Sequence, residues 1–160
     1  MTESKAVMLP KSVTPSRYAL TLCPNLETFV FTGEVEIDIE ILQPTNSIVL
    51  NAAELEINSC WLINSNNTTL SPSKTILEEK SETLTFMFEE DIPVGNAKLK
   101  IEFTGELNDR LRGFYRSRYH DGNGKERYLA TTQFEATDAR RAFPCWDCLL
   151  YTSPSPRDRG

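Results

Sequence analysis

The sequence predicts an all-β fold, a curved antiparallel β-sandwich, and three observations carry this prediction. Several segments alternate apolar and polar residues with a period of two, which is typical of a strand with one buried face. Pro, Gly, Asn and Asp gather between these segments, where they favour turns. No segment of helical length shows a 3.6-residue period. Many short strands with regular turn signals favour a sandwich or a large curved sheet.

Four segments show the strongest strand patterns. From Glu34 to Ile41 the alternation is strict, with aliphatic side chains on one face and carboxylates on the other. The segments RYALTLC, TLTFMFE and KLKIEFTG repeat the pattern. Weaker strands are expected at Ile48–Asn51, Leu55–Ile63, Phe114–Tyr119 and Arg127–Gln133.

Turn residues separate these predicted strands. The turns are expected at Pro24-Asn25, Pro44-Thr45-Asn46, Asn64–Thr69 and Pro93-Val94-Gly95-Asn96. Asp121-Gly122-Asn123-Gly124 lies between two tyrosine-containing segments and predicts a hairpin loop. The carboxylates between Glu34 and Glu40 are spaced too evenly for a calcium site, so we expect a solvated face that discourages edge pairing.

Composition limits the function classes. The 160 residues suffice for one domain with a core, and the net charge of −6 argues against a nucleic-acid surface. No apolar run is long enough to cross a membrane, and MTESKAVMLPKSVTP has no apolar signal core. We therefore expect a cytoplasmic protein with no membrane or nucleic-acid partner.

The sequence contains no complete active site. His120 is the one histidine, and no zinc-binding or serine-hydrolase motif is present. We therefore predict no catalytic residue and no metal ligand in this chain. Cys145-Trp146-Asp147-Cys148 forms a C-x-x-C, but a redox motif needs a following helix, and Pro and Ser follow here instead.

Several segments together resemble one enzyme family. They are LPKSVTPSRYALTLCPNLETFVFTGEVEIDIEI, IVLNAAELEI, IEFTGELNDRLRGFYRSRY and RYLATTQFEATDARRAFPCWD. This combination resembles the M1 family of zinc aminopeptidases, most closely the puromycin-sensitive type, from about Leu9 to Asp147. The resemblance assigns residues 1–147 to a truncated, saddle-like N-terminal β domain. Asn51 departs from the family, which commonly has His there, and we expect a structural role for it.

The resemblance also implies an activity for the intact parent. The parent would use zinc to remove N-terminal residues from peptides that have a free N-terminus. The zinc would lie in a downstream catalytic domain that is missing here, so this fragment should bind no zinc and be inactive. An alternative from another class stays open, namely a non-catalytic β-sandwich binding module.

One part of the active site is expected in this chain. In relatives, the Gln and Glu of T-Q-F-E reach the catalytic cleft, and here they are Gln133 and Glu135. Residues i and i+2 of an extended segment point the same way. The resemblance implies that Glu135 binds the substrate's α-ammonium group and that Gln133 lines the first side-chain pocket. The alternative is a polar pair at a strand end.

The segment ATDARRAFPCWD predicts a compact turn and a short helix. Asp138, Arg140 and Arg141 could form ion pairs that hold the preceding loop, and Phe143, Pro144 and Trp146 are expected to pack. The family pattern stops after Asp147. Residues 148–160 resemble the in-frame translation of a sequencing-library adapter, so we expect a non-native tail there.

Overall fold

The computed structural model describes residues 9–109, 113–133 and 138–146. These parts contain ten β-strands and a short 3₁₀ helix, η1 (Asp138–Arg141). In chain order the strands are β1 (Val13–Asn25), β2 (Val30–Ile41), β3 (Thr45–Asn51), β4 (Leu55–Ile63), β5 (Thr69–Leu70), β6 (Lys74–Glu78), β7 (Thr83–Ile92), β8 (Gly95–Glu106), β9 (Gly113–His120) and β10 (Glu126–Gln133). The short helix predicted near the C-terminal end is confirmed.

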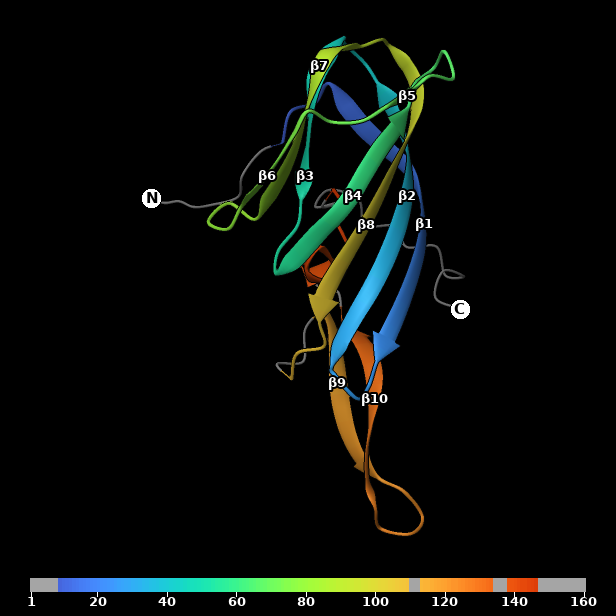
Figure 1. Cartoon of the computed structure of the whole chain (residues 1–160), viewed down its shortest axis with the longest axis vertical. Helices are drawn as coiled ribbons and strands as arrows, with labels where there is room; N and C mark the ends of the chain where they lie inside the picture. Colours follow the sequence, from blue (N-terminus) through green and yellow to red (C-terminus); the bar gives the residue numbers. More distant parts are fainter. Residues whose placement is uncertain (1–8, 110–112, 134–137, 147–160) are drawn as a thin grey trace.

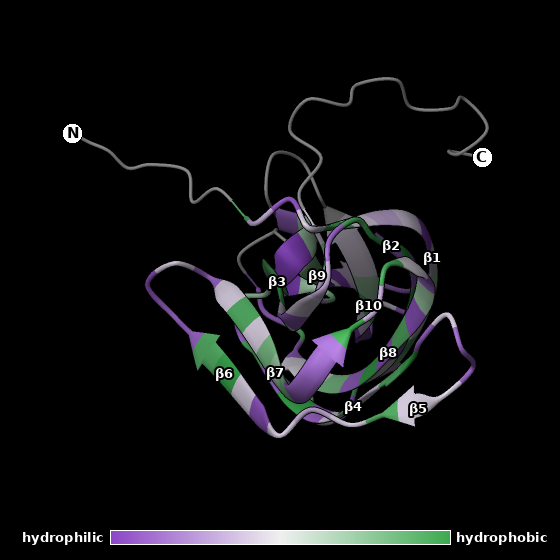
Figure 2. Cartoon of the chain, turned by 90° about the horizontal axis from the view of Figure 1, so that it is seen from above, coloured by the Kyte–Doolittle hydropathy of each residue, from purple (hydrophilic) through white to green (hydrophobic). Residues whose placement is uncertain are grey.

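Two antiparallel sheets form the body of the molecule (Figure 1). One has five strands in the order β1-β2-β8-β4-β5, and the other has three in the order β3-β7-β6. β9 and β10 form a separate hairpin that extends beyond the sandwich along the long axis. Seen along that axis, the strands curve around a common interior (Figure 2). The predicted curved antiparallel β-sandwich is confirmed.

The apolar face of β2 supplies the centre of the core. Its aliphatic side chains Val35, Ile37, Ile39 and Ile41 are at most 1% exposed. They join Leu99, Ile101 and Phe103 of β8, and Leu84 and Phe86 of β7, in one hydrophobic cluster. Burying each such side chain stabilises the fold by roughly 1.5–3 kcal/mol. The strict alternation in the sequence therefore predicted the correct buried face.

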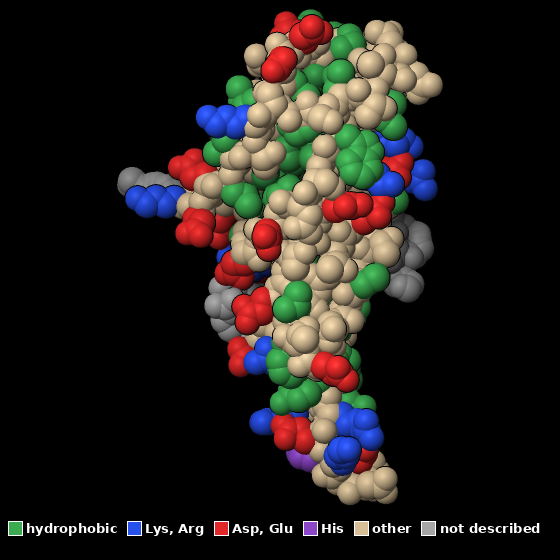
Figure 3. All heavy atoms as spheres, viewed as in Figure 1, with side chains coloured by type: hydrophobic (Ala, Val, Ile, Leu, Met, Phe, Trp, Pro, Cys, Tyr) green, Lys and Arg blue, Asp and Glu red, His purple; other side chains and the backbone are tan. Residues whose placement is uncertain are grey.

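The carboxylates of β2 lie on the opposite, solvent-facing side. The Nζ atom of Lys100 lies 2.8 Å from Glu34, and that of Lys98 lies 2.9 Å from Glu36 and 3.5 Å from Asp38. The hydrogen bond with Glu36 is the main reason that the pKa of Lys98 rises above its ordinary value. Figure 3 shows acidic and basic side chains interspersed over this face of the molecule. These carboxylates thus form a solvated face, as predicted. The expected role against edge pairing is wrong, because β2 lies between β1 and β8 and is not an edge strand.

Two reciprocal Gly–Phe pairs join β2 and β8. Phe31 lies opposite Gly105, and Gly33 lies opposite Phe103. A Cβ atom built on Gly105 would lie 2.4 Å from Cζ of Phe31, and one built on Gly33 would lie 2.4 Å from Cζ of Phe103. Each ring thus covers the glycine of the neighbouring strand, which is a known way to stabilise a glycine in a sheet. The two rings meet edge to face with centroids 6.5 Å apart.

The predicted hairpin loop between β9 and β10 is confirmed. Oδ1 of Asp121 accepts hydrogen bonds from the backbone N–H groups of Asn123 at 2.9 Å and Lys125 at 3.0 Å. Oδ2 accepts one from Nε of Arg127 at 2.7 Å. The Arg127 contact is the largest cause that lowers the pKa of Asp121, and the two backbone donors add to it.

Acidification is expected to loosen this turn. Because the folded pKa of Asp121 lies below its ordinary value of 3.8, its carboxylate stabilises the hairpin fully above about pH 4. This contribution is lost as the pH falls through the folded pKa. The NMR amide shifts of Asn123 and Lys125 should therefore move with a midpoint below pH 3.8.

The Asp121→Asn variant is the matched control for that titration. It keeps an Oδ1 acceptor but has no charge that titrates. Its two amide shifts should stay flat over the same pH range. Equal movement in both proteins would show that another group controls the turn.

Several predicted boundaries were wrong. β1 continues through Pro24-Asn25, β3 begins at Thr45, β5 at Thr69 and β8 at Gly95, so four predicted turns overlap strand ends. Pairing with a neighbouring strand extends each strand into the turn-forming residues. The two-residue strand β5 was not predicted, and neither was β6. Its five residues are all exposed, so it has no buried face that would impose an alternating pattern.

Candidate functional site

The structure places Gln133 at the end of β10. Its backbone pairs with Gly113, the first residue of β9. Glu135 lies outside the described residues, as does the rest of segment 134–137. The structure therefore supports a strand end at Gln133 and leaves the juxtaposition of Gln133 and Glu135 as a prediction.

Gly113 is the first described residue after positions 110–112. Its φ is +71°, in the left-handed region that favours glycine. A Cβ atom there would lie 2.8 Å from Cβ of Arg141 and 3.6 Å from the backbone oxygen of Asp138. Gly113 thus contacts Gln133 on one side and η1 on the other. Gln133 and Asp138, the described residues on either side of 134–137, therefore both lie beside Gly113 at the root of the hairpin.

Two arginines of η1 hold it against the sandwich. Nη1 of Arg141 donates to Glu54 at 2.7 Å, Nη2 donates to Glu82 at 3.2 Å, and Nε donates to Asp138 at 3.3 Å. Nη1 of Arg140 donates to the other oxygen of Glu82 at 2.7 Å. The arginine side chains are only 12–13% exposed. We call these five residues the arginine clamp.

The predicted ion pairs of the η1 segment are confirmed, but sequence reasoning missed two partners. Glu54 lies in the turn before β4, and Glu82 lies in the turn before β7. Both have positive φ angles, of 62° and 55°, although neither is glycine. Such backbone conformations are costly and persist only where other contacts enforce them. The clamp supplies such contacts at both turns.

Backbone hydrogen bonds join the segment after η1 to the sandwich. Asn51 and Cys145 exchange two N–H···O bonds of 2.7 and 2.9 Å, and N–H of Ala53 donates to the oxygen of Arg140 at 3.0 Å. Asn51 is 3% exposed, and its Nδ2 donates to the backbone oxygen of Glu82 at 3.3 Å. The departure from the family pattern at Asn51 therefore occupies a structural position, as expected.

Aromatic packing completes this attachment. The rings of Phe143 and Tyr18 meet edge to face with centroids 5.9 Å apart, and the Tyr18 hydroxyl accepts from N–H of Trp146 at 2.9 Å. Pro144 and Trp146 are buried. The packing role predicted for Phe143, Pro144 and Trp146 is confirmed.

None of the described cysteines, Cys23, Cys60 and Cys145, is in a disulfide. Cys145 is buried at 4% exposure, and Cys148 lies outside the described residues. Burial raises the pKa of the Cys60 thiol to about 12, which suppresses the reactive thiolate. Within ranges 9–109, 113–133 and 138–146, no three His, Cys, Asp or Glu side chains come together as a metal site would require.

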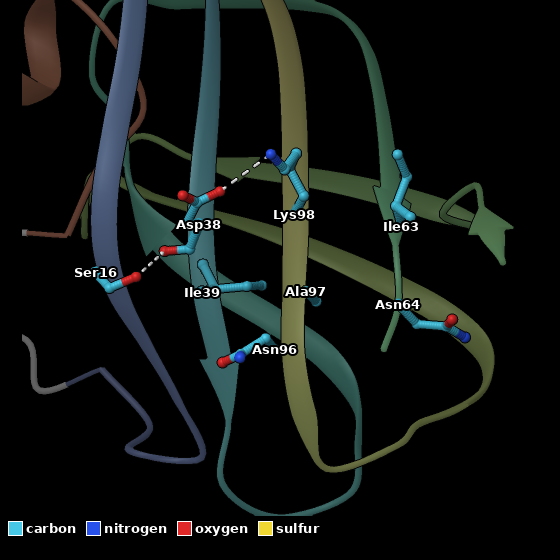
Figure 4. Close-up of a pocket in the computed structure, with 8 residues that line it drawn as sticks. All are labelled: Ser16, Asp38, Ile39, Ile63, Asn64, Asn96, Ala97 and Lys98. Atoms are coloured by element: carbon cyan, nitrogen blue, oxygen red, sulfur yellow. Dashed lines mark hydrogen bonds and ion pairs between the residues drawn. The ribbon is translucent and has the colours of Figure 1, made fainter. Parts of the chain in front are cut away.

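A hollow of about 360 Å³ lies where β1 begins and β2 ends (Figure 4). Ser16, Asp38, Ile39, Ile63, Asn64, Asn96, Ala97 and Lys98 line it. Oγ of Ser16 donates to the backbone oxygen of Asp38 at 3.2 Å, and Lys98 pairs with the Asp38 carboxylate at 3.5 Å. These groups bind one another, and the lining includes no His or Cys, so we assign no function to it.

The two antiparallel sheets, with the β9–β10 hairpin and η1 at one end, define an all-β domain. The chain belongs to the M1 peptidase family, because the model of the peptidase M1 N-terminal domain matches residues 14–148. The matched region corresponds to the N-terminal domain of these peptidases. In the part of the chain that the structure describes, we find no helix long and apolar enough to cross a membrane.

Named aminopeptidases from plants, fungi and animals are similar to the chain. It is 46% identical over 142 residues to aminopeptidase M1 of Arabidopsis thaliana. It is 42% identical over 145 residues to mitochondrial aminopeptidase 2 of Saccharomyces cerevisiae, and 40% over 143 residues to the puromycin-sensitive aminopeptidase of Caenorhabditis elegans. These alignments cover 87–89% of the chain but only 15–16% of each relative. The cytoplasmic location stays a prediction.

Proposed function

We propose that this chain is the N-terminal domain of a zinc-dependent aminopeptidase and that it supplies Gln133 and Glu135 to the site that binds the peptide's N-terminus. One observation carries the proposal. Gln133 and Asp138, which flank segment 134–137, both lie beside Gly113, the first through strand pairing and the second through η1. Flanking residues held in this way would favour precise placement of a substrate contact between them. The family match also spans this segment.

The chemistry of these two residue types fits that role. A peptide α-amino group has a pKa of about 8, so it is largely cationic at neutral pH. A carboxylate at Glu135 would accept charge-assisted hydrogen bonds from it. The Gln133 amide would offer a donor and an acceptor to the first residue of the peptide. Such contacts would favour cleavage next to a free N-terminus.

The described residues do not fit zinc, since they contain no suitable cluster of ligands. We therefore assign no reaction step through a metal to this chain. Zinc and the catalytic groups would belong to the parent's downstream domain, and the isolated chain would cleave nothing. Hydrolysis of leucyl-aminocoumarin by the purified chain, above a buffer control and with zinc added, would contradict this.

The central test is Glu135→Gln in the intact parent. Glutamine keeps the size and removes the charge, so the enzyme should lose a charged hydrogen bond worth about 1.5–3 kcal/mol. We expect kcat/KM for peptides with a free N-terminus to fall about 10- to 100-fold. Discrimination against N-acetylated peptides should shrink as well.

Glu90→Gln is the matched control, because Glu90 is an exposed carboxylate on β7. It should leave kcat/KM within about twofold of the wild type, as expected for a solvent-exposed site. If Glu135→Gln behaves like this control, Glu135 does not bind the substrate amine.

We also propose that residues 148–160 are not native to the parent. Their resemblance to a translated adapter supports this. Sequencing the source transcript downstream of the Asp147 codon tests it. A frame that continues into family sequence supports the proposal, whereas a stop codon after Gly160 would favour the non-catalytic binding module.

A further inference from the structure

Strand β6 is an exposed sheet edge. In the three-stranded sheet its neighbour is β7, and Figure 2 shows β6 at the outer margin beyond β7. All five of its residues are exposed. Ile76 and Leu77 are 40% and 39% exposed, and as consecutive strand residues they point to opposite faces. β6 therefore presents apolar side chains on both faces next to an open backbone edge.

The other edges of the two sandwich sheets carry features that oppose strand addition. β1 contains Pro15 and Pro24 and has a register shift between Pro15 and Arg17. β5 has only two residues, and the end of β3 pairs with Cys145. Proline, irregular register and short length are common ways to block an edge. β6 contains no proline, glycine or register shift.

The charges of β6 are self-complementary. The strand reads Lys74-Thr75-Ile76-Leu77-Glu78, with its two charges at equal distances from Ile76. We propose that β6 pairs antiparallel with β6 of a second copy of this chain, centred on Ile76. Lys74 then lies opposite Glu78 of the second copy, and Glu78 opposite its Lys74. The two Ile76 side chains meet on the same face, and Leu77 meets Thr75 on the other.

Neighbouring registers are less favourable. A slip of one residue places Lys74 opposite Leu77 in one direction and opposite Glu79, which lies beyond the end of β6, in the other. Either slip also turns the side chains of the second copy to the opposite face of the joined sheet, so the two Ile76 side chains no longer meet. A slip of two residues places Lys74 opposite Ile76 in one direction and opposite Lys80 in the other. The Ile76-centred register is thus the one that joins both charge pairs and the two isoleucines. Cross-strand pairs of this kind are what stabilise one register over another.

Such a dimer would be weak. Two five-residue strands bury less surface than the roughly 1,200 Å² of a stable interface. We therefore expect concentration-dependent association in roughly the 10 μM to 1 mM range. The joined sheets would have six strands, twice the three of one chain. This inference does not depend on the proposed aminopeptidase function.

Sedimentation of the complete 160-residue chain from about 5 μM to 1 mM tests the proposal. Lys74→Glu places two Glu–Glu pairs across the joint, and Glu78→Lys places two Lys–Lys pairs there. Each should weaken dimerisation at least about tenfold. An equimolar mixture of the two variants restores both opposite-charge pairs and should dimerise as well as the wild type.

Two further variants complete the experiment. Ile76→Lys places like charges at the centre and should abolish the dimer, whereas Lys11→Glu, an exposed site outside the strands, should leave it intact. Because all these side chains are exposed, the variants should fold. A chain that stays monomeric at 1 mM would overturn the proposal. So would a dimer that persists in all three β6 variants, or two single variants that do not associate when mixed.

Discussion

Replacing Gly105 with valine is expected to lower the free energy of unfolding of this domain by about 3 kcal/mol. The added Cβ would lie 2.4 Å from Cζ and 2.7 Å from Cε1 of Phe31, and 2.9 Å from Cδ2 of Leu55. Phe31 is 1% exposed and packs against Phe103 and Phe114, so its ring cannot move aside without disturbing the core. Urea unfolding should show this loss. The midpoint of thermal unfolding should fall by about 6–12 °C.

Gly122→Val is the matched control for this substitution. Gly122 lies in the hairpin loop, and nothing lies within 4 Å of a Cβ atom built there. The same change of residue should therefore shift the free energy of unfolding by less than about 1 kcal/mol. A similar loss at both glycines would mean that valine acts through the backbone and not through contact with the Phe31 ring.

A double-mutant cycle locates the cause more closely. Phe31→Leu removes the ring atoms that the new Cβ would meet. If ring overlap dominates, Gly105→Val should cost at least about 1 kcal/mol less in the Phe31→Leu background than in the wild type. Additive losses would contradict the proposed Gly–Phe contact.

The sequence predicted the features that depend on neighbouring residues and missed those that depend on contacts between distant parts of the chain. The alternation from Glu34 to Ile41 is local, and it predicted both the strand and the face that enters the core. The turn at Asp121 likewise depends on residues within six positions. By contrast, Gly33 and Gly105 resemble strand-breaking residues until the register places a phenylalanine opposite each. Their stabilising partners come from another strand and leave no local signal.

The same distinction applies to the candidate site. The sequence predicted that Asp138, Arg140 and Arg141 form ion pairs, because basic and acidic residues are close neighbours there. The partners Glu54 and Glu82 lie 87 and 58 positions away, so no spacing rule could find them. Gly113 gave no signal either, since its need for a positive φ arises from the approach of η1. Family resemblance alone pointed to Gln133 and Glu135.

Arg141→Met is the second substitution with a large expected effect, a loss of about 2–3 kcal/mol in the free energy of unfolding. Arg141 is 12% exposed and donates to Glu54, Glu82 and Asp138. Charged hydrogen bonds contribute roughly 1.5–3 kcal/mol each when buried. The three carboxylates are 26–39% exposed, so water partly replaces the lost donor and the total stays below the sum. Urea unfolding measures the loss.

Arg118→Met is the control for that measurement. The Arg118 side chain is 66% exposed and pairs with Glu126 at 3.2 Å. Losing such a surface pair should cost less than about 1 kcal/mol.

Arg141→Lys should recover only part of the stability, because one ammonium cannot match a planar guanidinium that reaches three carboxylates. If Lys restores the wild-type value, charge alone matters and the fork geometry does not.

The arginine clamp also predicts which part of the backbone opens more often when Arg141 is replaced. Arg141 holds η1 against Gly113, where β9 begins and where Gln133 pairs. Without the arginine, the backbone at the root of the hairpin should open more often, while the β2–β8 ladder keeps its own hydrogen bonds. Hydrogen exchange in Arg141→Met should therefore speed up at Gly113 and Gln133 well before it does at Val35 or Ile101. Uniform acceleration at all four amides would mean that Arg141 supports only global stability, and that the arginine clamp does not hold the root of the hairpin.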